Sequence, residues 1–110
     1  MMKQTLKFEI ELDENNLPLN IEMHASDGAA NENNIKALMV SAWAAKTKET
    51  LRIDLWTKDM PVNEMFIMYH QTMMGMADTL NRSTGRDKLA GALRDYCEFF
   101  AEETEIKGTK

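Results

Sequence analysis

Hydrophobic and polar residues alternate with period two along the first half of the chain. Apolar side chains occupy every second position in residues 6–12 and again in residues 19–25, the pattern of half-buried β-strands. Between these runs, residues 13–18 contain Asp, Asn and Pro, which favour turns. The pattern therefore predicts that the first two strands form a hairpin.

Two further strands are expected before the pattern changes. Residues 26–34 are small and polar and predict a loop, whereas residues 36–43 are apolar on both faces, as in a strand that is central or covered on both sides. A turn at residues 45–49 leads to a fourth alternating run at residues 51–55. Four consecutive strands are most simply joined as a meander.

The hydrophobic period changes to 3.6 residues after Asp59, which indicates helices. We predict a first helix at about residues 60–81 and a second at about residues 86–103. Their apolar stripes contain Val62, Met65, Met68, Tyr69, Thr72, Met73, Met76 and Leu80 in the first, and Leu89, Ala92, Leu93, Tyr96, Cys97 and Phe100 in the second.

Several residues are expected to start or end these helices. Pro61 fits the first turn of the first helix, with Asp59 or Met60 at the cap, and Thr84 with Asp87 resembles a capping box for the second. Glu103 falls on the apolar stripe, so the second helix should fray or leave the core there. Residues 107–110 are expected to be a loose tail.

These elements predict a single α+β domain spanning residues 1–110. The strands, all within residues 5–58, would form a four-stranded antiparallel meander, and both helices would pack on one face of it, in the order ββββαα. A chain of 110 residues is long enough for one hydrophobic core. No internal repeat or linker divides the sequence.

Composition and charge exclude several classes of partner. The formal net charge is −5, which repels a phosphate backbone, so we expect no nucleic-acid binding. No apolar stretch approaches the length of a membrane span, so we expect no direct membrane insertion. The start of the chain lacks the pattern of a secretory signal, and the one cysteine, Cys97, forms no internal disulfide. We therefore expect a cytoplasmic protein.

The sequence contains no constellation of catalytic or metal-binding residues. Cys97 has Asp95 and Glu98 beside it, the opposite of the positive surroundings that activate a thiolate. His24 lies on the polar face of a strand and His70 on the polar face of a helix without a ligand at helical spacing, so both are interpreted as solvated. We predict no catalytic residue, no cofactor and no metal, and hence no enzyme.

Apolar residues on faces that are predicted to be solvent-exposed are more informative about function. If the turn near residue 47 pairs Trp43 with Arg52, Met39 pairs with Trp56 on the same outer face of the sheet. A slip of one residue would move Met39 and Trp43 inward. Such patches mark sites of partner binding or self-association. The predicted interaction surface comprises Met39, Trp43 and Trp56 on the sheet, with Ile67 and Met74 on the polar side of the first helix.

The sequence also resembles a known family. Residues 46–62 (KTKETLRIDLWTKDMPV) look like the GldC family of gliding-motility proteins, and residues 11–18 (ELDENNLP) resemble the opening of that family. Residues 70–72 and 76–79 resemble its helical part, and the similarity extends from about residue 5 to residue 106. The resemblance implies a small cytoplasmic protein of gliding bacteria of the Bacteroidetes type. It also implies an association with the GldB lipoprotein of the motility machinery, and it assigns no catalytic or ligand-binding residue.

Two functions remain as hypotheses. The first is a non-enzymatic accessory protein of the gliding machinery that acts through protein contacts, including formation of a homodimer through the outer sheet face. The alternative is a small-molecule binding or sensing domain with a pocket between the sheet and the helices, because methionine-rich cores adapt to ligands.

Overall fold

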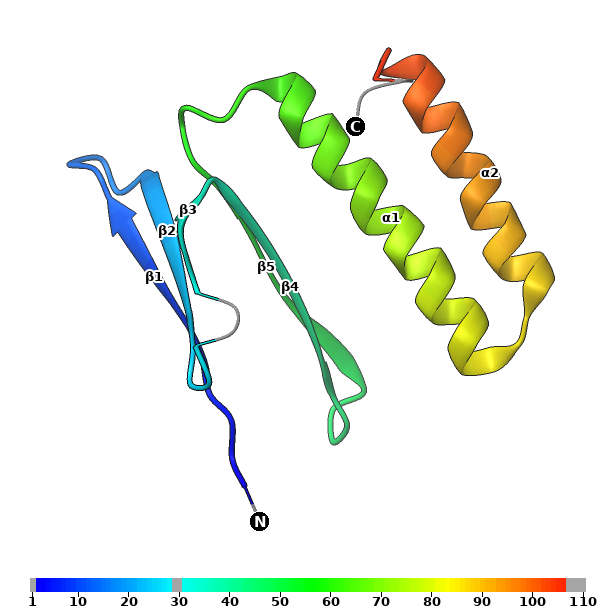
Figure 1. The fold of residues 1–110 in the computed structure, drawn as a ribbon, viewed down its shortest axis with the longest axis horizontal. Helices are drawn as coiled ribbons and strands as arrows, with labels where there is room; N and C mark the ends of the chain where they lie inside the picture. Colours follow the sequence, from blue (N-terminus) through cyan, green and yellow to red (C-terminus); the bar gives the residue numbers. More distant parts are fainter. Residues whose placement is uncertain (1, 29–30, 107–110) are drawn as a thin grey trace. The chain divides into compact units, whose positions relative to one another are not determined.

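The computed structural model describes residues 2–28 and 31–106, so the predicted loose tail at residues 107–110 lies outside the described residues. The chain forms two compact units, one ending at Met60 and the other beginning at Pro61 (Figure 1). The described elements follow the order β1 (Leu6–Leu12), β2 (Pro18–Ala25), β3 (Glu32–Ile35), β4 (Ala37–Ala44), β5 (Glu49–Trp56), α1 (Val62–Thr84) and α2 (Asp87–Glu103).

The strands form two sheets rather than the single four-stranded meander that was predicted. One sheet has the order β1-β2-β3, and the other contains β4 and β5. The α+β class and the succession of strands followed by helices are confirmed. The packing of both helices on one sheet face stays a prediction.

The β1–β2 hairpin follows the predicted alternation. Glu9 pairs with Glu22 and Ile10 with Ile21, so the charged positions share one face and the apolar positions share the other. Ile21 is fully buried. In the turn, Asn16 adopts the left-handed conformation, which Asn tolerates better than most residues.

The polar segment predicted as a loop contains an additional strand, β3. Ile35 pairs with Ile21 and Glu32 with Met23, with an irregularity between the two pairs. The amide of Asn20 also donates a hydrogen bond to the carbonyl oxygen of Asn33 at 3.0 Å. The sequence pattern did not predict this strand because residues 32–34 show no alternation of apolar and polar side chains. Its backbone pairing with β2 alone defines it.

A break at Lys36 explains why the meander is divided. Both the backbone N–H and the hydroxyl of Thr57 donate to the carbonyl oxygen of Lys36, at 2.8 and 3.1 Å, and Thr57 is buried. The chain therefore pairs with β2 before Lys36 and with β5 after it. The predicted third strand exists as β4, but β3 takes its place beside β2.

The register of β4 and β5 differs from the expected one by two residues. Trp43 pairs with Thr50 and Met39 with Asp54, while Trp56 pairs with Ala37. A shift of two residues preserves the faces, because side chains alternate with period two. The shared face of Met39, Trp43 and Trp56 is therefore confirmed, whereas the predicted pairings of Trp43 with Arg52 and Met39 with Trp56 are wrong.

The ends of the helices differ from the predicted caps. Pro61 is the cap of α1, and α1 continues to Thr84 before Gly85 ends it in the left-handed conformation. The predicted capping box does not form, because Arg86 is the cap of α2 and has no side-chain cap hydrogen bond. The hydroxyl of Thr84 instead accepts a hydrogen bond from the backbone N–H of Arg86 at 3.1 Å.

Helices α1 and α2 lie side by side and antiparallel (Figure 1). The ring of Phe100 meets the edge of Phe66 at 6.0 Å between centroids and stacks on Tyr69 at 6.2 Å. Farther along, Arg94 donates to a carboxylate oxygen of Asp78 at 2.9 Å. Within the described residues, neither helix combines the length and hydropathy that crossing a membrane requires.

The buried faces of the helices are lined by small side chains. The buried position of Cys97 is confirmed, but Ala90 and Ala101 are also buried, whereas the predicted core residues Leu89 and Tyr96 are exposed. Periodicity gives most weight to large apolar residues. Alanine allows a close approach of helices despite its small apolar area, so the pattern pointed to a face rotated from the buried one.

Candidate functional site

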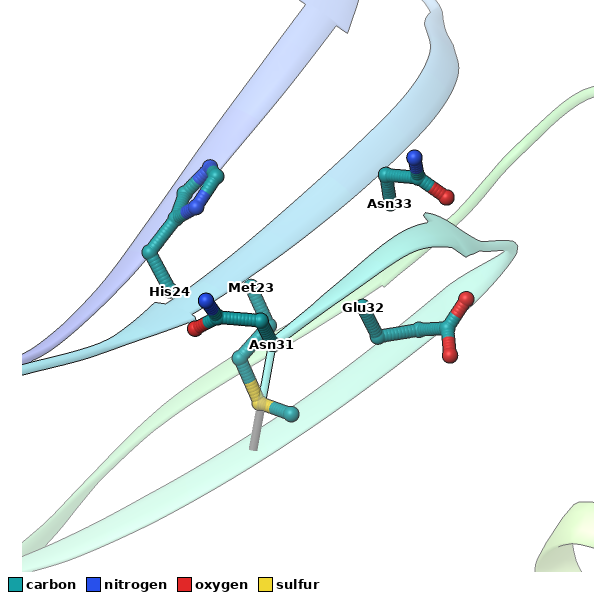
Figure 2. Close-up of a pocket in the computed structure, with 5 residues that line it drawn as sticks. All are labelled: Met23, His24, Asn31, Glu32 and Asn33. Carbon is teal, nitrogen blue, oxygen red and sulfur yellow. The ribbon is translucent and has the colours of Figure 1, made fainter. Parts of the chain in front are cut away.

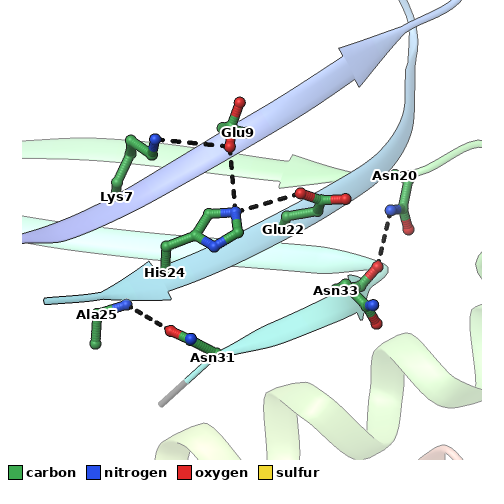
Figure 3. Close-up of polar contacts among 8 residues, drawn as sticks. All are labelled: Lys7, Glu9, Asn20, Glu22, His24, Ala25, Asn31 and Asn33. Atoms are coloured by element: carbon green, nitrogen blue, oxygen red, sulfur yellow. Dashed lines mark hydrogen bonds and ion pairs between the residues drawn. The ribbon is translucent and has the colours of Figure 1, made fainter. Parts of the chain in front are cut away.

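The polar face of the β1–β2 hairpin gathers two carboxylates around one imidazole. Glu9 and Glu22 pair directly across the two strands, and Lys7 and His24 form the next pair on that face. Nε2 of His24 lies 3.1 Å from Oε1 of Glu9 and 3.2 Å from Oε1 of Glu22. Figure 3 shows both carboxylates directed at the same ring nitrogen.

The hairpin positions this cluster through its alternation. Glu22 and His24 are two residues apart on β2 and therefore point to the same side, while the register places Glu9 opposite. Like charges that pair directly across strands repel each other. Lys7 offsets this repulsion only in part, because its Nζ atom is 3.7 Å from Glu9 and both side chains are largely exposed.

The cluster has the composition of a cation site. The three ligand atoms of Glu9, Glu22 and His24 lie within 4.8 Å of one another, the only such group of three among the residues that the structure describes. Their side chains are 59%, 44% and 39% exposed. The Nε2 atom of His24 carries either one proton or one lone pair. It can therefore contact both carboxylates at once only by sharing its proton between them or by binding a cation together with them.

An open pocket of about 300 Å³ adjoins the cluster. His24 contributes to its wall, and Figure 2 shows the side chains that line it. The side-chain oxygen of Asn31 accepts a hydrogen bond from the backbone N–H of Ala25 at 2.9 Å, which closes the strand end beside the pocket. The lining residues are Met23, His24, Asn31, Glu32 and Asn33.

A second, mostly apolar groove lies on the helical unit. Its volume is about 640 Å³, and it is open to solvent. Helix α1 contributes most of its lining and Leu93 of α2 closes one side. The lining residues are Thr72, Gly75, Met76, Thr79, Leu80, Ser83 and Leu93.

The predicted interaction residues of the sheet share a face without forming one continuous apolar patch. Trp43 is 64% exposed and Trp56 is 43% exposed, but they lie near opposite ends of the β4–β5 ribbon, about 20 Å apart along the strand. Met39 is half-buried and diagonal to Trp56. Between the indoles, Arg52 donates to Ser41 and to Asp54, each at 2.7 Å.

The two predicted residues of the first helix are less exposed than the indoles. Ile67 and Met74 are half-buried, as is His70 between them. A spacing of seven residues places Ile67 and Met74 on one face of α1, and Ala77, three residues farther, is fully buried. Their role in binding a partner stays a prediction.

Sequence reasoning missed the convergence on His24. It placed His24 on the polar face of its strand, which the register confirms, but it considered no partner across the strands. The turn at residues 13–17 is not a sufficient signal for the cluster. It pairs Leu12 with Pro18, and only the register shift between Glu11 and Leu12 then places Glu9 opposite Glu22 rather than Ile21.

Comparison with known proteins identifies the family of the chain. No curated protein and no solved structure shows significant similarity to it. Residues 18–106, which include β2 to β5 and both helices, match the family model described as "Gliding motility-associated protein GldC-like". Since the match spans most of the sequence, the chain belongs to the GldC-like family of gliding motility-associated proteins.

Proposed function

We propose that this protein is a non-enzymatic accessory component of the bacterial gliding machinery and acts by protein–protein contact. The β4–β5 ribbon would supply the contact surface through its face that carries Met39, Trp43 and Trp56, called the indole face below. Family membership supports the link to motility, and the GldC-like family is not a known enzyme family.

The observation that carries the proposal is the exposure of the two indoles. Trp43 is 64% exposed and Trp56 is 43% exposed. Covering the exposed part of an indole such as Trp43 removes on the order of 100 Å² of apolar surface from water, about 3 kcal/mol of stabilisation. Tryptophan is also the residue most enriched among those that dominate binding energies.

The polar residues between the indoles favour a protein as partner. Arg52 is held by Asp54 and Ser41, so its guanidinium is presented in a defined orientation beside an acidic group. Arginine and tryptophan are both enriched among the residues that dominate the binding energy of protein interfaces. We propose that the partner is a component of the motility machinery, with the GldB lipoprotein or a second copy of this chain as candidates.

We propose that the protein acts in the cytoplasm. Cys97 is its only cysteine and is buried and unpaired, which suits a reducing compartment. Fractionation of a gliding bacterium with an antibody against the protein tests this location.

A pull-down from a gliding bacterium tests the contact surface. The tagged wild-type protein should recover motility components, and the double variant Trp43→Asp/Trp56→Asp should lose them. Phe99→Asp is the matched control, since Phe99 is an exposed aromatic residue on α2. Equal recovery by the wild type and the double variant would exclude the indole face, and recovery of no motility component would contradict the function.

Self-association requires its own measurement. Light scattering on the purified wild type, the double variant and Phe99→Asp compares their molar masses. A dimer that persists in Phe99→Asp and dissociates in the double variant supports pairing through the indole face. A wild-type monomer at all concentrations would rule out the homodimer and leave the heterologous partner.

A small-molecule binding domain is the second candidate, and the groove on the helical unit favours it. The surface of this groove is mostly apolar, and the groove is large enough for a small ligand. The earlier expectation of a pocket between sheet and helices stays a prediction. Native mass spectrometry of freshly purified protein would reveal a retained ligand, and Leu93→Arg should abolish its retention. An empty mass in several preparations would contradict this candidate.

A further inference from the structure

We propose that Glu9, Glu22 and His24 form a surface binding site for a divalent transition-metal ion, with Zn²⁺ as the best fit. The site lies on the polar face of the β1–β2 hairpin, apart from the indole face, and goes beyond the proposed function. It also departs from the sequence-based expectation of no metal.

The spacing of the three ligand atoms suits a zinc ion. Zinc binds imidazole nitrogen and carboxylate oxygen at about 2.0–2.2 Å, so ligand atoms around a tetrahedral ion lie about 3.3 Å apart. The distances from Nε2 of His24 are 3.1 Å to Glu9 and 3.2 Å to Glu22. The ligand oxygens of Glu9 and Glu22 lie within 4.8 Å of each other, so they would have to approach by at most about 1.5 Å to hold an ion at tetrahedral spacing.

The charges at the site favour a cation. Glu9 and Glu22 face each other directly, and an ion between them would replace their repulsion with attraction to a shared positive centre. Lys7 is exposed and contacts Glu9 at the long distance of 3.7 Å, so its flexible side chain can move away. Movement of Lys7 costs little because an exposed ion pair contributes little stability.

The donor set distinguishes among metals. An imidazole with two carboxylates suits zinc, cobalt and nickel, whereas calcium and magnesium prefer oxygen ligands alone. Three protein ligands leave at least one coordination position open, and the exposure of the three side chains gives water or a donor group of another molecule access to it. The site has the composition of an open zinc site rather than a closed structural one.

The two paired strands hold the ligands in place before the ion arrives. Glu22 and His24 are on β2 and Glu9 is on β1, and continuous backbone pairing runs from Leu6 to Glu11 on β1. Ligands on paired strands are positioned more accurately than ligands on loops. The imidazole is the central ligand because it alone contacts both carboxylates.

Zinc titration of the purified protein tests the proposal. Isothermal titration calorimetry should show one Zn²⁺ bound per protein chain, and Co²⁺ should produce visible absorption bands at the same stoichiometry. His24→Ala and Glu22→Gln should weaken Zn²⁺ binding by roughly 10–100-fold or more, because loss of a ligand costs at least as much as loss of its supporting partners.

Two variants provide matched controls. His70→Ala removes the other histidine, which lies on α1, and Glu11→Gln removes a carboxylate from the same face of β1, opposite Asn20. Both should bind Zn²⁺ like the wild type. All four substitutions are outside the buried core, and circular dichroism verifies that each variant is folded.

Two outcomes would overturn the proposal. The first is that the wild-type protein binds no Zn²⁺ at micromolar to millimolar concentrations. The second is that the His24→Ala and His70→Ala variants bind Zn²⁺ with equal affinity. The assay uses purified protein without a partner, so its failure is distinct from failure of the proposed motility contact. The indole-face variant Trp43→Asp/Trp56→Asp should keep wild-type zinc affinity.

Discussion

Lys58 donates a hydrogen bond from its ammonium group to Oδ2 of Asp13 at 2.8 Å, across a sequence separation of 45 residues. The other carboxylate oxygen of Asp13 accepts the backbone N–H groups of Asn15 and Leu17 at 2.8 and 2.9 Å. The backbone N–H of Lys58 also donates to the carbonyl oxygen of Pro18. One carboxylate thus organises the β1–β2 turn and ties it to the segment that follows β5.

Asp13→Asn should lower stability at neutral pH. The hydrogen bonds from Lys58 and the turn hold the pKa of Asp13 at about 2, below its ordinary value of 3.8. A lowered pKa in the folded state contributes stability above the unfolded pKa, and this contribution disappears as the pH falls through the folded pKa. The difference in melting temperature between wild type and variant should therefore be largest near pH 7 and shrink between about pH 4 and 2.

Thermal unfolding by circular dichroism at several pH values measures this difference. Asparagine keeps an oxygen that can accept the turn N–H groups, so the substitution removes only the charge and the oxygen that accepts from Lys58. Glu14→Gln is the control, because it removes an exposed carboxylate next to Asp13 and leaves the contact of Asp13 with Lys58 in place. A destabilisation of Asp13→Asn that is equal at pH 2 and pH 7 would contradict the ionic contribution.

Thr57→Val should lower the free energy of unfolding by about 1 kcal/mol. The substitution keeps the side-chain volume and the backbone hydrogen bond to Lys36, but removes the hydroxyl donor that reaches the same carbonyl oxygen at 3.1 Å. Urea unfolding measures the change. Thr50→Val, at an exposed position of β5, should lie within about 0.5 kcal/mol of the wild type. Equal stabilities of the two variants would show that the buried hydroxyl is dispensable.

Two glycine substitutions should have opposite signs. Gly85 ends α1 with a φ of 67°, where a Cβ atom is strained, so Gly85→Ala should cost about 1 kcal/mol. Gly91 lies within α2, and an added Cβ would meet no atom within 4 Å. Gly91→Ala should therefore stabilise the protein by about 0.5–1 kcal/mol. Chemical denaturation measures the free energy of unfolding of both variants. Stabilisation by Gly85→Ala would be inconsistent with the left-handed cap.

Phe100→Ala should destabilise the helical unit more than Phe99→Ala does. The ring of Phe100 contacts Phe66, Tyr69 and Tyr96, whereas Phe99 contacts Tyr96 and is exposed. The free energy of unfolding should fall by about 2–3 kcal/mol in Phe100→Ala and by less than about 1 kcal/mol in Phe99→Ala. The reason is that Phe100→Ala removes packed aromatic surface, whereas Phe99→Ala removes mostly solvent-exposed surface. Far-ultraviolet circular dichroism during urea unfolding measures both, and the reverse order would contradict the described packing of α1 on α2.

The burial of Cys97 could be predicted from the sequence because this residue lies where the predicted apolar stripe overlaps the buried face of α2, whereas Leu89 and Tyr96 of the same stripe are exposed. The thiol is buried and unpaired, as expected. The same periodicity missed the buried positions of Ala90 and Ala101, since alanine contributes little to the apolar signal. Which stripe of a helix is buried depends on the neighbour, and only the folded hairpin of α1 and α2 shows it.

Local pattern alone determined the change from strands to helices after Asp59 and the common face of Met39, Trp43 and Trp56. Both follow from the geometry of the chain itself, because side chains repeat with period two in a strand and 3.6 in a helix. Tertiary structure decided the break at Lys36, the pairing partner of Trp43, and the meeting of Glu9 and Glu22 at His24. These depend on hydrogen bonds between distant segments, whose alignment no local window of residues contains.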